Sequence, residues 1–332
     1  MKILVTGGAG FIGYHLTKKL LNNGFEILSI DSLNDYYDVN LKKNRIANIE
    51  SSENANAFKF HKVDLTNKEH CYDIFSKNKF DIVIHLAAQP GVRYSIENPH
   101  AYIDSNIQGF MNVIEGCRNF DIKHFIYASS SSVYGLNVSV PFKTTDNTDN
   151  PISLYAATKK SNELIAQTYS HLYGIPTTGL RFFTVYGPYG RPDMAYFNFT
   201  KSILSGNPID AYGYGELKRD FTYVDDITEG LLRLIDKPPT RQQNELSNIS
   251  SFHKIFNIGN NSPVTVNEFI RTIEIACGKK AIVNRKPMPL GDVTETYADI
   301  DDLFEHTGFK PITSLEVGIT NFVKWYKEYA LK

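Results

Sequence analysis

The chain has 332 residues, of which 42% are hydrophobic, so it can bury a large core and is expected to form one larger domain with a smaller appended one. Its 35 Lys and Arg nearly balance its 36 Asp and Glu, and the formal charge of −1 gives no electrostatic case for binding nucleic acid or a membrane surface. The three cysteines, Cys71, Cys117 and Cys277, are odd in number and far apart, which argues against a disulfide framework or a metal site.

The first predicted strand begins at Lys2, so we expect no export signal before it, and no later stretch is apolar over the ~20 residues of a membrane span. We therefore expect a cytoplasmic protein whose thiols stay reduced.

Residues 1–15 read as an apolar strand that runs into glycines spaced three apart and then into an amphipathic helix. Gly7 permits a tight reversal, Gly10 lets the backbone approach a pyrophosphate, and Gly13 lets the helix pack closely on the strand. The N–H groups at the start of the helix attract an anion. This order predicts a dinucleotide site, although a glycine triplet alone is a weak signal.

The next predicted strand, 26–30, ends in Asp31, where an acid can accept hydrogen bonds from the ribose hydroxyls of adenosine. No Arg or Lys follows at 32–34, and a negative Asp31 repels a 2′-phosphate. The pattern therefore predicts NAD and disfavours NADP.

Apolar runs at 2–6, 27–30, 58–63, 82–86, 125–129 and 177–183 alternate with helical patterns, as in a doubly wound parallel sheet of the Rossmann type. We expect an NAD-binding domain at 1–184 and a smaller α/β substrate domain at 185–332, with a segment near 254–258 returning to the main sheet. Helices are expected at 198–205 and 225–235. The last segment carries Leu315, Ile319, Phe322 and Tyr326 at helical spacing, which indicates a packed helix.

Asp64 and Leu65 follow the third strand, where such sheets contact adenine. Asp64 is equally well explained as the cap of a helix at 67–77, and the sequence does not decide between the two.

Tyr155 and Lys159 lie one helical turn apart on one face of a predicted helix. A tyrosine normally has a pKa near ~10, and a neighbouring ammonium favours the phenolate, which makes the pair a candidate general base. Lys159 can also hold the nicotinamide ribose. The serines at 129–132 run off the carboxyl end of the fifth strand, where open sheets bind ligands.

The glycine triplet, the serines and the Tyr-x-x-x-Lys pair, in this order, resemble the extended short-chain dehydrogenase/reductase superfamily along essentially the whole chain. The stretches 31–38, 85–93, 181–188, 190–195, 219–226 and 291–293 are similar to UDP-sugar 4-epimerases, and specifically to UDP-glucuronate 4-epimerases. Pro90 departs from that subgroup, which more often has alanine there, and no functional conclusion follows from it.

The resemblance implies a set of functional residues. It makes Ser130 the catalytic hydroxyl, places Thr184 against the hexose, Arg191 against its carboxylate, and Arg219 with Asp292 on the uridine diphosphate. Arg191 sits in a Gly/Pro loop where a solvated arginine is common, but its planar guanidinium matches a carboxylate. Asn106 is expected to brace the backbone near the tyrosine, and the residues assigned to the cofactor besides those above are Phe11, Ile12, Leu86, Ala87, Ala88 and Asn106.

The resemblance also implies a UDP-sugar substrate, NAD as a tightly held cofactor, and a homodimer through helices near 103–118 and 153–173. Alternatives stay open: a 4-epimerase of UDP-N-acetylglucosamine or UDP-glucose, a UDP-glucuronate decarboxylase, or a binding protein without turnover. Dehydratases of the superfamily carry an Asp-Glu pair where this chain has Ser131 and Ser132, and decarboxylases usually have glutamate at the position of Ser132.

Overall fold

The computed structural model describes residues 1–243, 250–288 and 294–331. These residues divide into two compact units, which are described separately. The first unit comprises 1–135, 144–182 and 230–256, and the second comprises 136–143, 183–229 and 257–332.

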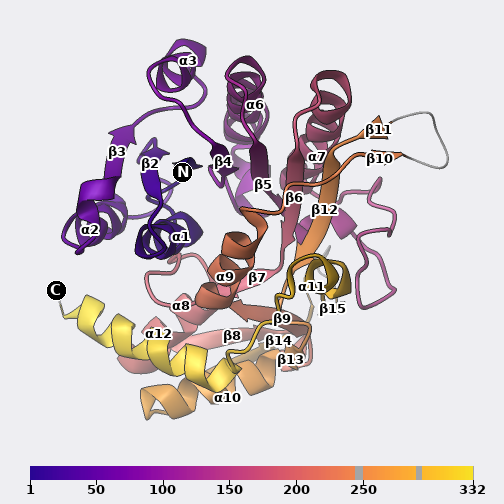
Figure 1. Cartoon of the computed structure of the whole chain (residues 1–332). Coiled ribbons are helices and arrows are strands. Elements are labelled where there is room, and N and C mark those ends of the chain that lie inside the picture. The colour runs from indigo at the N-terminus through magenta and orange to yellow at the C-terminus, as the bar shows by residue number, and fades with distance from the viewer. Residues whose placement is uncertain (244–249, 289–293, 332) are drawn as a thin grey trace. The chain divides into compact units, whose positions relative to one another are not determined.

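A seven-stranded sheet forms the centre of the first unit (Figure 1). Its order is β12-β6-β5-β4-β1-β2-β3, and neighbouring strands from β6 to β3 are parallel. The strands are β1 (Lys2–Thr6), β2 (Glu26–Asp31), β3 (Phe58–Lys62), β4 (Ile82–His85), β5 (His124–Ser130), β6 (Thr177–Phe182) and β12 (His253–Ile258). The predicted α/β fold with a doubly wound parallel sheet is confirmed, and the strand expected near 254–258 lies beside β6.

Helices cover both faces of this sheet, because each strand returns to its parallel neighbour through a crossover. In Figure 1, α3, α6 and α7 lie together on one face, and α1 and α2 lie on the other. Their bounds are α1 (Phe11–Asn22), α2 (Val39–Glu50), α3 (Lys68–Ser76), α4 (Tyr94–Glu97), α5 (Pro99–Tyr102), α6 (Gly109–Asn119) and α7 (Leu154–Tyr173). Short helical turns occur at η1 (Ala55–Ala57), η2 (Ile103–Gln108, π-helical) and η3 (Ser131–Tyr134).

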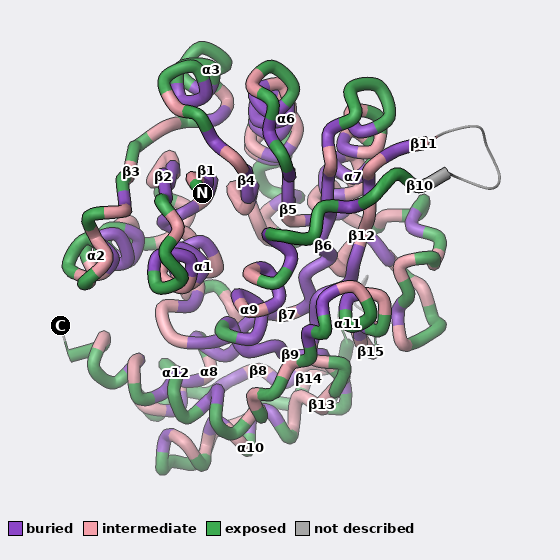
Figure 2. Tube along the Cα trace, in the orientation of Figure 1, coloured by how far each residue is buried: buried purple, intermediate pink, exposed green. Residues whose placement is uncertain are grey.

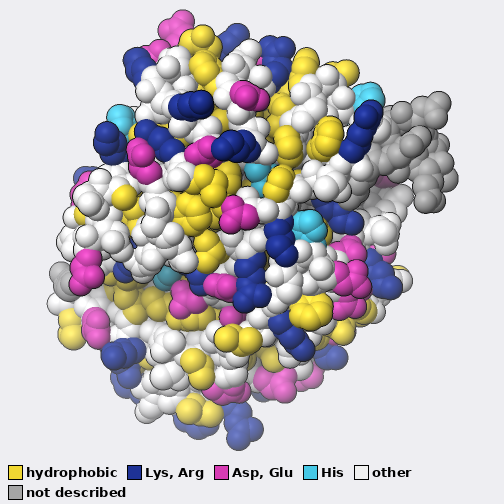
Figure 3. Space-filling model, in the orientation of Figure 1, with side chains coloured by type: hydrophobic (Ala, Val, Ile, Leu, Met, Phe, Trp, Pro, Cys, Tyr) yellow, Lys and Arg dark blue, Asp and Glu magenta, His cyan; other side chains and the backbone are white. Residues whose placement is uncertain are grey.

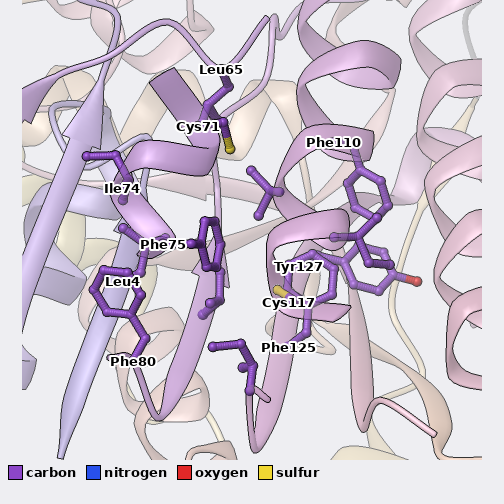
Figure 4. Packing of buried hydrophobic residues seen from close by; sticks show 14 of the residues in the cluster. Leu4, Leu65, Cys71, Ile74, Phe75, Phe80, Phe110, Cys117, Phe125 and Tyr127 are labelled. Carbon is purple, nitrogen blue, oxygen red and sulfur yellow. The ribbon is translucent and has the colours of Figure 1, made fainter. Parts of the chain in front are cut away.

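One hydrophobic cluster of the first unit lies between the sheet and α3, α6 and α7. Phe75, Phe110, Phe125 and Tyr127 pack there with aliphatic side chains and with the thiols of Cys71 and Cys117 (Figure 4). Strands β4, β5 and β6 are buried along almost their whole length, as strands covered on both faces must be (Figure 2).

The second unit has its own sheets and core. Strand β9 (Lys218–Tyr223) pairs with β7 (Thr184–Tyr186), β13 (Pro263–Thr265) and β15 (Glu295–Thr296), and β8 (Pro208–Tyr212) pairs with β14 (Ile282–Lys286). Helices α8 (Ala195–Ser205), α10 (Val266–Cys277) and α12 (Leu315–Ala330) bury an aromatic-rich core against them. Ile319, Phe322 and Tyr326 are buried in it, which confirms the packed terminal helix.

The remaining elements are η4 (Gly213–Gly215), α9 (Val224–Leu234), the β10 (Gln242–Gln243) and β11 (Ser250–Ser251) pair, and α11 (Asp301–Thr307). Acidic and basic side chains are interspersed on the face drawn in Figure 3. Within the described residues, no helix combines the length and apolar character needed to cross a membrane. The same residues contain no group of His, Cys, Asp or Glu side chains that could hold a metal ion.

Candidate active site

The glycine-rich turn after β1 has no space for side chains. Gly7 has a φ of 71°, and a Cβ on it would lie 2.7 Å from the Ala87 nitrogen. A Cβ on Gly13 would lie 2.2 Å from the Gly7 carbonyl oxygen, so the close approach that Gly13 permits is to the turn itself. No side chain among the described residues caps α1 at Gly10, so its first N–H groups remain for an anion. This cradle fits the pyrophosphate of a dinucleotide.

Asp31 ends β2 beside that turn. Its carboxylate accepts hydrogen bonds from the Ala9 N–H (3.2 Å) and the Leu33 N–H (2.8 Å), which fix its orientation. Two cations from α2 also reach this region: Lys42 donates to the Asn34 carbonyl (2.7 Å), and Arg45 donates to the Ala9 carbonyl (2.8 Å). Burial lowers the pKa of Lys42, and the charge of Asp31 opposes that shift.

The structure excludes one of the two explanations of Asp64. Asn67 caps α3, since its side chain accepts the His70 N–H at 2.9 Å, so the interpretation of Asp64 as the cap is wrong. Asp64 instead accepts hydrogen bonds from the N–H and hydroxyl of Thr66, both at 2.9 Å. Leu65 is buried in the core, and the adenine contact of both residues stays a prediction.

Tyr155 and Lys159 lie on the first turns of α7. Ser153 caps this helix by accepting the Ala156 N–H at 3.1 Å, which fixes where it begins. The Lys159 ammonium donates to the Ala128 carbonyl of β5 at 2.9 Å. Burial lowers the pKa of Lys159 from 10.5 to about 8, so the ammonium gives up its proton more readily than an ordinary lysine.

Ser130 ends β5, and its hydroxyl oxygen accepts the Ser132 N–H at 3.1 Å. The neighbouring Ser129 hydroxyl donates to Glu163 of α7 at 2.6 Å. Glu163 also accepts two hydrogen bonds from Arg181 of β6, at 2.8 and 2.9 Å, and both charged side chains are buried. The Ser129–Glu163 and Lys159–Ala128 hydrogen bonds tie β5 to α7 immediately before Ser130, and the Arg181–Glu163 ion pair ties β6 to the same helix.

Asn106 lies in η2 and is fully enclosed. Its side chain accepts the Gln89 N–H (2.7 Å) and donates to the Gln89 carbonyl and the Thr158 hydroxyl, both at 3.1 Å. Thr158 in turn donates to the Tyr155 carbonyl at 2.8 Å. Asn106 therefore braces the backbone around Tyr155, and its contact with the cofactor stays a prediction.

The loop after β4 lies next to the glycine-rich turn. The Thr6 hydroxyl accepts the Ala87 N–H at 3.2 Å and contacts the Nδ1 atom of His85 at 2.8 Å. Burial and then the charge of Lys159 lower the pKa of His85 to about 3, so its imidazole is neutral at physiological pH. Leu86, Ala87 and Ala88 are half-buried at this position.

The second unit carries the residues expected to meet the sugar nucleotide. Thr184 begins β7, half-buried, opposite Phe221 of β9. The Arg191 guanidinium is paired with Asp193. Arg219 of β9 donates to the Lys218 carbonyl at 2.8 Å. Asp292 lies outside the described residues, and its role beside Arg219 stays a prediction.

A family model described as "NAD dependent epimerase/dehydratase family" matches residues 3–259. The chain belongs to this family. The membership confirms the resemblance stated from the sequence, and it confirms NAD as the cofactor of this epimerase/dehydratase family member.

Several known proteins are similar to this chain along its whole length. It is 56% identical to Protein CapI of Staphylococcus aureus, over 100% of both chains. It is 45% identical to the probable UDP-glucuronate 4-epimerase of Rhizobium meliloti, over 99% of this chain and 97% of that one. The crystal structure of UDP-glucuronic acid 4-epimerase from Bacillus cereus, with UDP-glucuronic acid and NAD, superposes with a TM-score of 0.87 at 33% identity, covering 99% of this chain and 100% of that one.

Several residues that support the site were not predicted from the sequence. The Arg181–Glu163 pair could have been found, because a charged residue within a predicted buried strand needs a partner of opposite charge. Lys42 is 11 residues from Asp31 in sequence, and it approaches Asp31 only because of the way α2 packs. Asp193 lies two residues after Arg191 and could have been considered as its partner.

Proposed function

We propose that this protein interconverts UDP-glucuronate and UDP-galacturonate by inverting carbon 4 of the sugar. The proposal rests on one observation above all. The residues expected to act on carbon 4, Ser130, Tyr155 and Lys159, lie on a strand and a helix that two side-chain hydrogen bonds tie together. Whole-chain similarity to proteins named as UDP-glucuronate 4-epimerases supports the same substrate.

In the proposed mechanism, Tyr155 removes the proton of the 4-hydroxyl group while Ser130 orients that oxygen. Lys159 supplies the positive charge that favours the tyrosinate one helical turn away. NAD, when bound, accepts the hydride from carbon 4 and later gives it back. The product of this half of the reaction is a 4-keto sugar that stays in the site.

Inversion then needs the 4-keto ring to turn about its pyrophosphate link and present its other face. Tyr155 returns its proton to the oxygen as the hydride returns to carbon 4, so the residue acts first as a base and then as an acid. The cofactor ends in its starting state and is not consumed.

Arg191 is proposed to bind the sugar carboxylate, because a planar guanidinium pairs with a carboxylate through two parallel hydrogen bonds. A neutral UDP-sugar has no need of such a group. A 4-keto uronate is a β-keto acid, which loses carbon dioxide when its carboxylate lies perpendicular to the ring carbonyl. An arginine that holds the carboxylate away from that orientation therefore protects the intermediate.

The competing functions lack their distinguishing residues. Ser131 and Ser132 of η3 supply no acid and base for eliminating water, and Ser132 stands where decarboxylases usually have glutamate. Ser132 disfavours a UDP-glucuronate decarboxylase without excluding it, and the other candidates are 4-epimerases of UDP-N-acetylglucosamine or UDP-glucose, which need no carboxylate clamp. A protein that only binds NAD would show no change near the NADH absorbance band when UDP-sugars are added.

The assembly and location belong to this proposal as well. We expect the chain to bind NAD through residues 1–184 and the UDP-sugar through 185–332, in the cytoplasm, and to form a homodimer through α6 and α7. These helices pack side by side, with Tyr169 donating to Glu115 at 2.6 Å. Leu164 and Leu172 of α7 are 58% and 60% exposed, which is the apolar surface that a dimer would cover.

A panel of UDP-sugars incubated with the protein and followed by proton NMR tests the substrate. UDP-glucuronate should be converted to UDP-galacturonate, and UDP-glucose and UDP-N-acetylglucosamine should react far more slowly. Arg191→Ala should weaken the binding of UDP-glucuronate by about 2–4 kcal/mol, since a charge-assisted bidentate contact is lost, and that of UDP-glucose much less. Equal losses for the two sugars would assign Arg191 to the loop and remove the basis for a uronate substrate.

A further inference from the structure

The arginine expected to bind the sugar carboxylate is already held by a carboxylate of its own loop. Arg191 donates from Nε to Asp193 Oδ1 at 3.0 Å and from Nη2 to Asp193 Oδ2 at 2.5 Å. The two side chains are 22% and 34% exposed, so the pair is partly shielded from water. Such a two-point contact fixes the plane of the guanidinium as well as its position.

The backbone that carries this pair is fixed independently. The Arg191 N–H donates to the hydroxyl of Tyr196, which is fully buried, at 3.2 Å. A Cβ on Gly190 would lie 2.0 Å from the same hydroxyl, so only glycine permits this contact. Tyr189 has a φ of 56°, and its ring packs on Trp325 of α12 at 5.0 Å. The loop is thus anchored on both sides of Arg191, and Asp193 anchors the end of its side chain.

We propose that Asp193 is a positioning residue that orients Arg191 for the sugar carboxylate and thereby sets the preference for charged over neutral UDP-sugars. This inference rests on the proposed function of Arg191. A long arginine side chain loses rotamer freedom when it binds a ligand, and an arginine that is already ordered loses less. Asp193 contacts the edge formed by Nε and Nη2, and a guanidinium has a second bidentate edge, formed by Nη1 and Nη2.

The inference predicts that the two carboxylates bind one guanidinium together. If the uronate instead displaced Asp193, the aspartate would act as a competitor, and its removal would strengthen substrate binding. The two possibilities therefore predict opposite changes in UDP-glucuronate affinity when Asp193 is substituted. Binding of both carboxylates to Arg191 is favoured because the loop keeps Asp193 close to Arg191. The two residues lie in a turn that is closed by a hydrogen bond from the Met194 N–H to the Arg191 carbonyl at 3.2 Å.

The test compares Asp193→Asn with a matched control in the full-length, NAD-loaded protein. Asp210→Asn is the control, because Asp210 forms a similar surface ion pair in the same unit, with Lys286 at 2.7 Å. Calorimetric titrations give the dissociation constants of UDP-glucuronate and UDP-glucose for each variant. Asp193→Asn should weaken the binding of UDP-glucuronate about 3- to 10-fold, which is the usual cost of ordering one long side chain, and should leave the binding of UDP-glucose unchanged. Asp193→Glu should recover part of the loss, and the control should affect neither sugar.

Product analysis adds a readout that a loss of folding would not produce. A poorly oriented Arg191 holds the uronate carboxylate less firmly, so the carbon 5–carbon 6 bond of the 4-keto intermediate breaks more often and carbon dioxide leaves. The electron pair passes into the enolate of the 4-keto group, and water protonates carbon 5. Return of the stored hydride then gives a UDP-pentose, whose fraction should rise in Asp193→Asn and not in the control.

Three results would overturn the inference: unchanged UDP-glucuronate binding, tighter binding, or equal weakening of both sugars in Asp193→Asn. Arg191→Ala, measured beside it, separates this failure from that of the proposed function. If Arg191→Ala discriminates between the sugars and Asp193→Asn does not, only the role of Asp193 is lost. If Arg191→Ala does not discriminate, the carboxylate clamp itself is refuted.

Discussion

Lys159 should reduce the stability of the folded protein while serving its reaction. Its pKa of about 8 lies some 2.5 units below its ordinary value of 10.5, which corresponds to about 3 kcal/mol against the charged form at pH 7. Lys159→Met removes that cost and also the bond to the Ala128 carbonyl, worth roughly 1 kcal/mol. The variant should therefore be more stable than the natural protein by about 2 kcal/mol at pH 7, and should have lost turnover.

The stability difference between Lys159→Met and the natural protein should depend on pH. Between about pH 8 and 10.5 the unfolded lysine keeps its proton and the folded one has lost it, so raising the pH increases the free energy of unfolding of the natural protein. The advantage of Lys159→Met should be complete below pH 8 and disappear towards pH 10.5.

Urea unfolding at pH 7 and pH 10, with NAD removed from both proteins, measures the difference. Lys77→Met, at a side chain that is 70% exposed, is the control and should show no such change. An advantage of Lys159→Met that stays constant with pH would refute the reasoning.

Four further predictions concern the reaction, the buried ion pair and the assembly. Tyr155→Phe should keep the fold and bound NAD but lose roughly two to four orders of magnitude in kcat, the scale of general acid–base catalysis, and unchanged steady-state rates would remove Tyr155 as the base. Ser130→Ala should lose less, and wild-type rates would transfer its role to Ser131 or Ser132. Glu163→Gln leaves Arg181 buried without its counter-charge and should cost about 3–5 kcal/mol in urea unfolding, whereas a cost near zero would contradict the buried pair. Light scattering at micromolar concentration should give the mass of a dimer, and a monomer mass would contradict the proposed α6–α7 interface.

Most of the nucleotide-binding fold follows from local sequence signals. The buried strands read as continuous apolar runs, and the turn at Gly7 and Gly13 needs residues without a Cβ. The spacing of Tyr155 and Lys159 places them on one helix face whatever the rest of the chain does.

The supporting contacts depend on packing between distant segments and could not be read from local patterns. Asn106 lies 17 residues from Gln89 and 52 from Thr158, and its three contacts exist only because η2 packs against α7 and the loop after β4. The cap of α3 shows the limit of local reasoning, since Asp64 and Asn67 are both good capping residues. Only the position where the helix begins decides for Asn67.

The central claim, inversion of carbon 4 by one hydride that leaves and returns, is tested most directly by running the reaction in deuterated water. UDP-galacturonate formed from UDP-glucuronate should carry no deuterium at carbon 4 or carbon 5 in its proton NMR spectrum, should keep its carboxylate, and should form without free NADH accumulating over many turnovers. Deuterium at carbon 5 would show an enolising route, and substantial UDP-pentose from the unmodified protein would show a decarboxylase; either result would contradict the account.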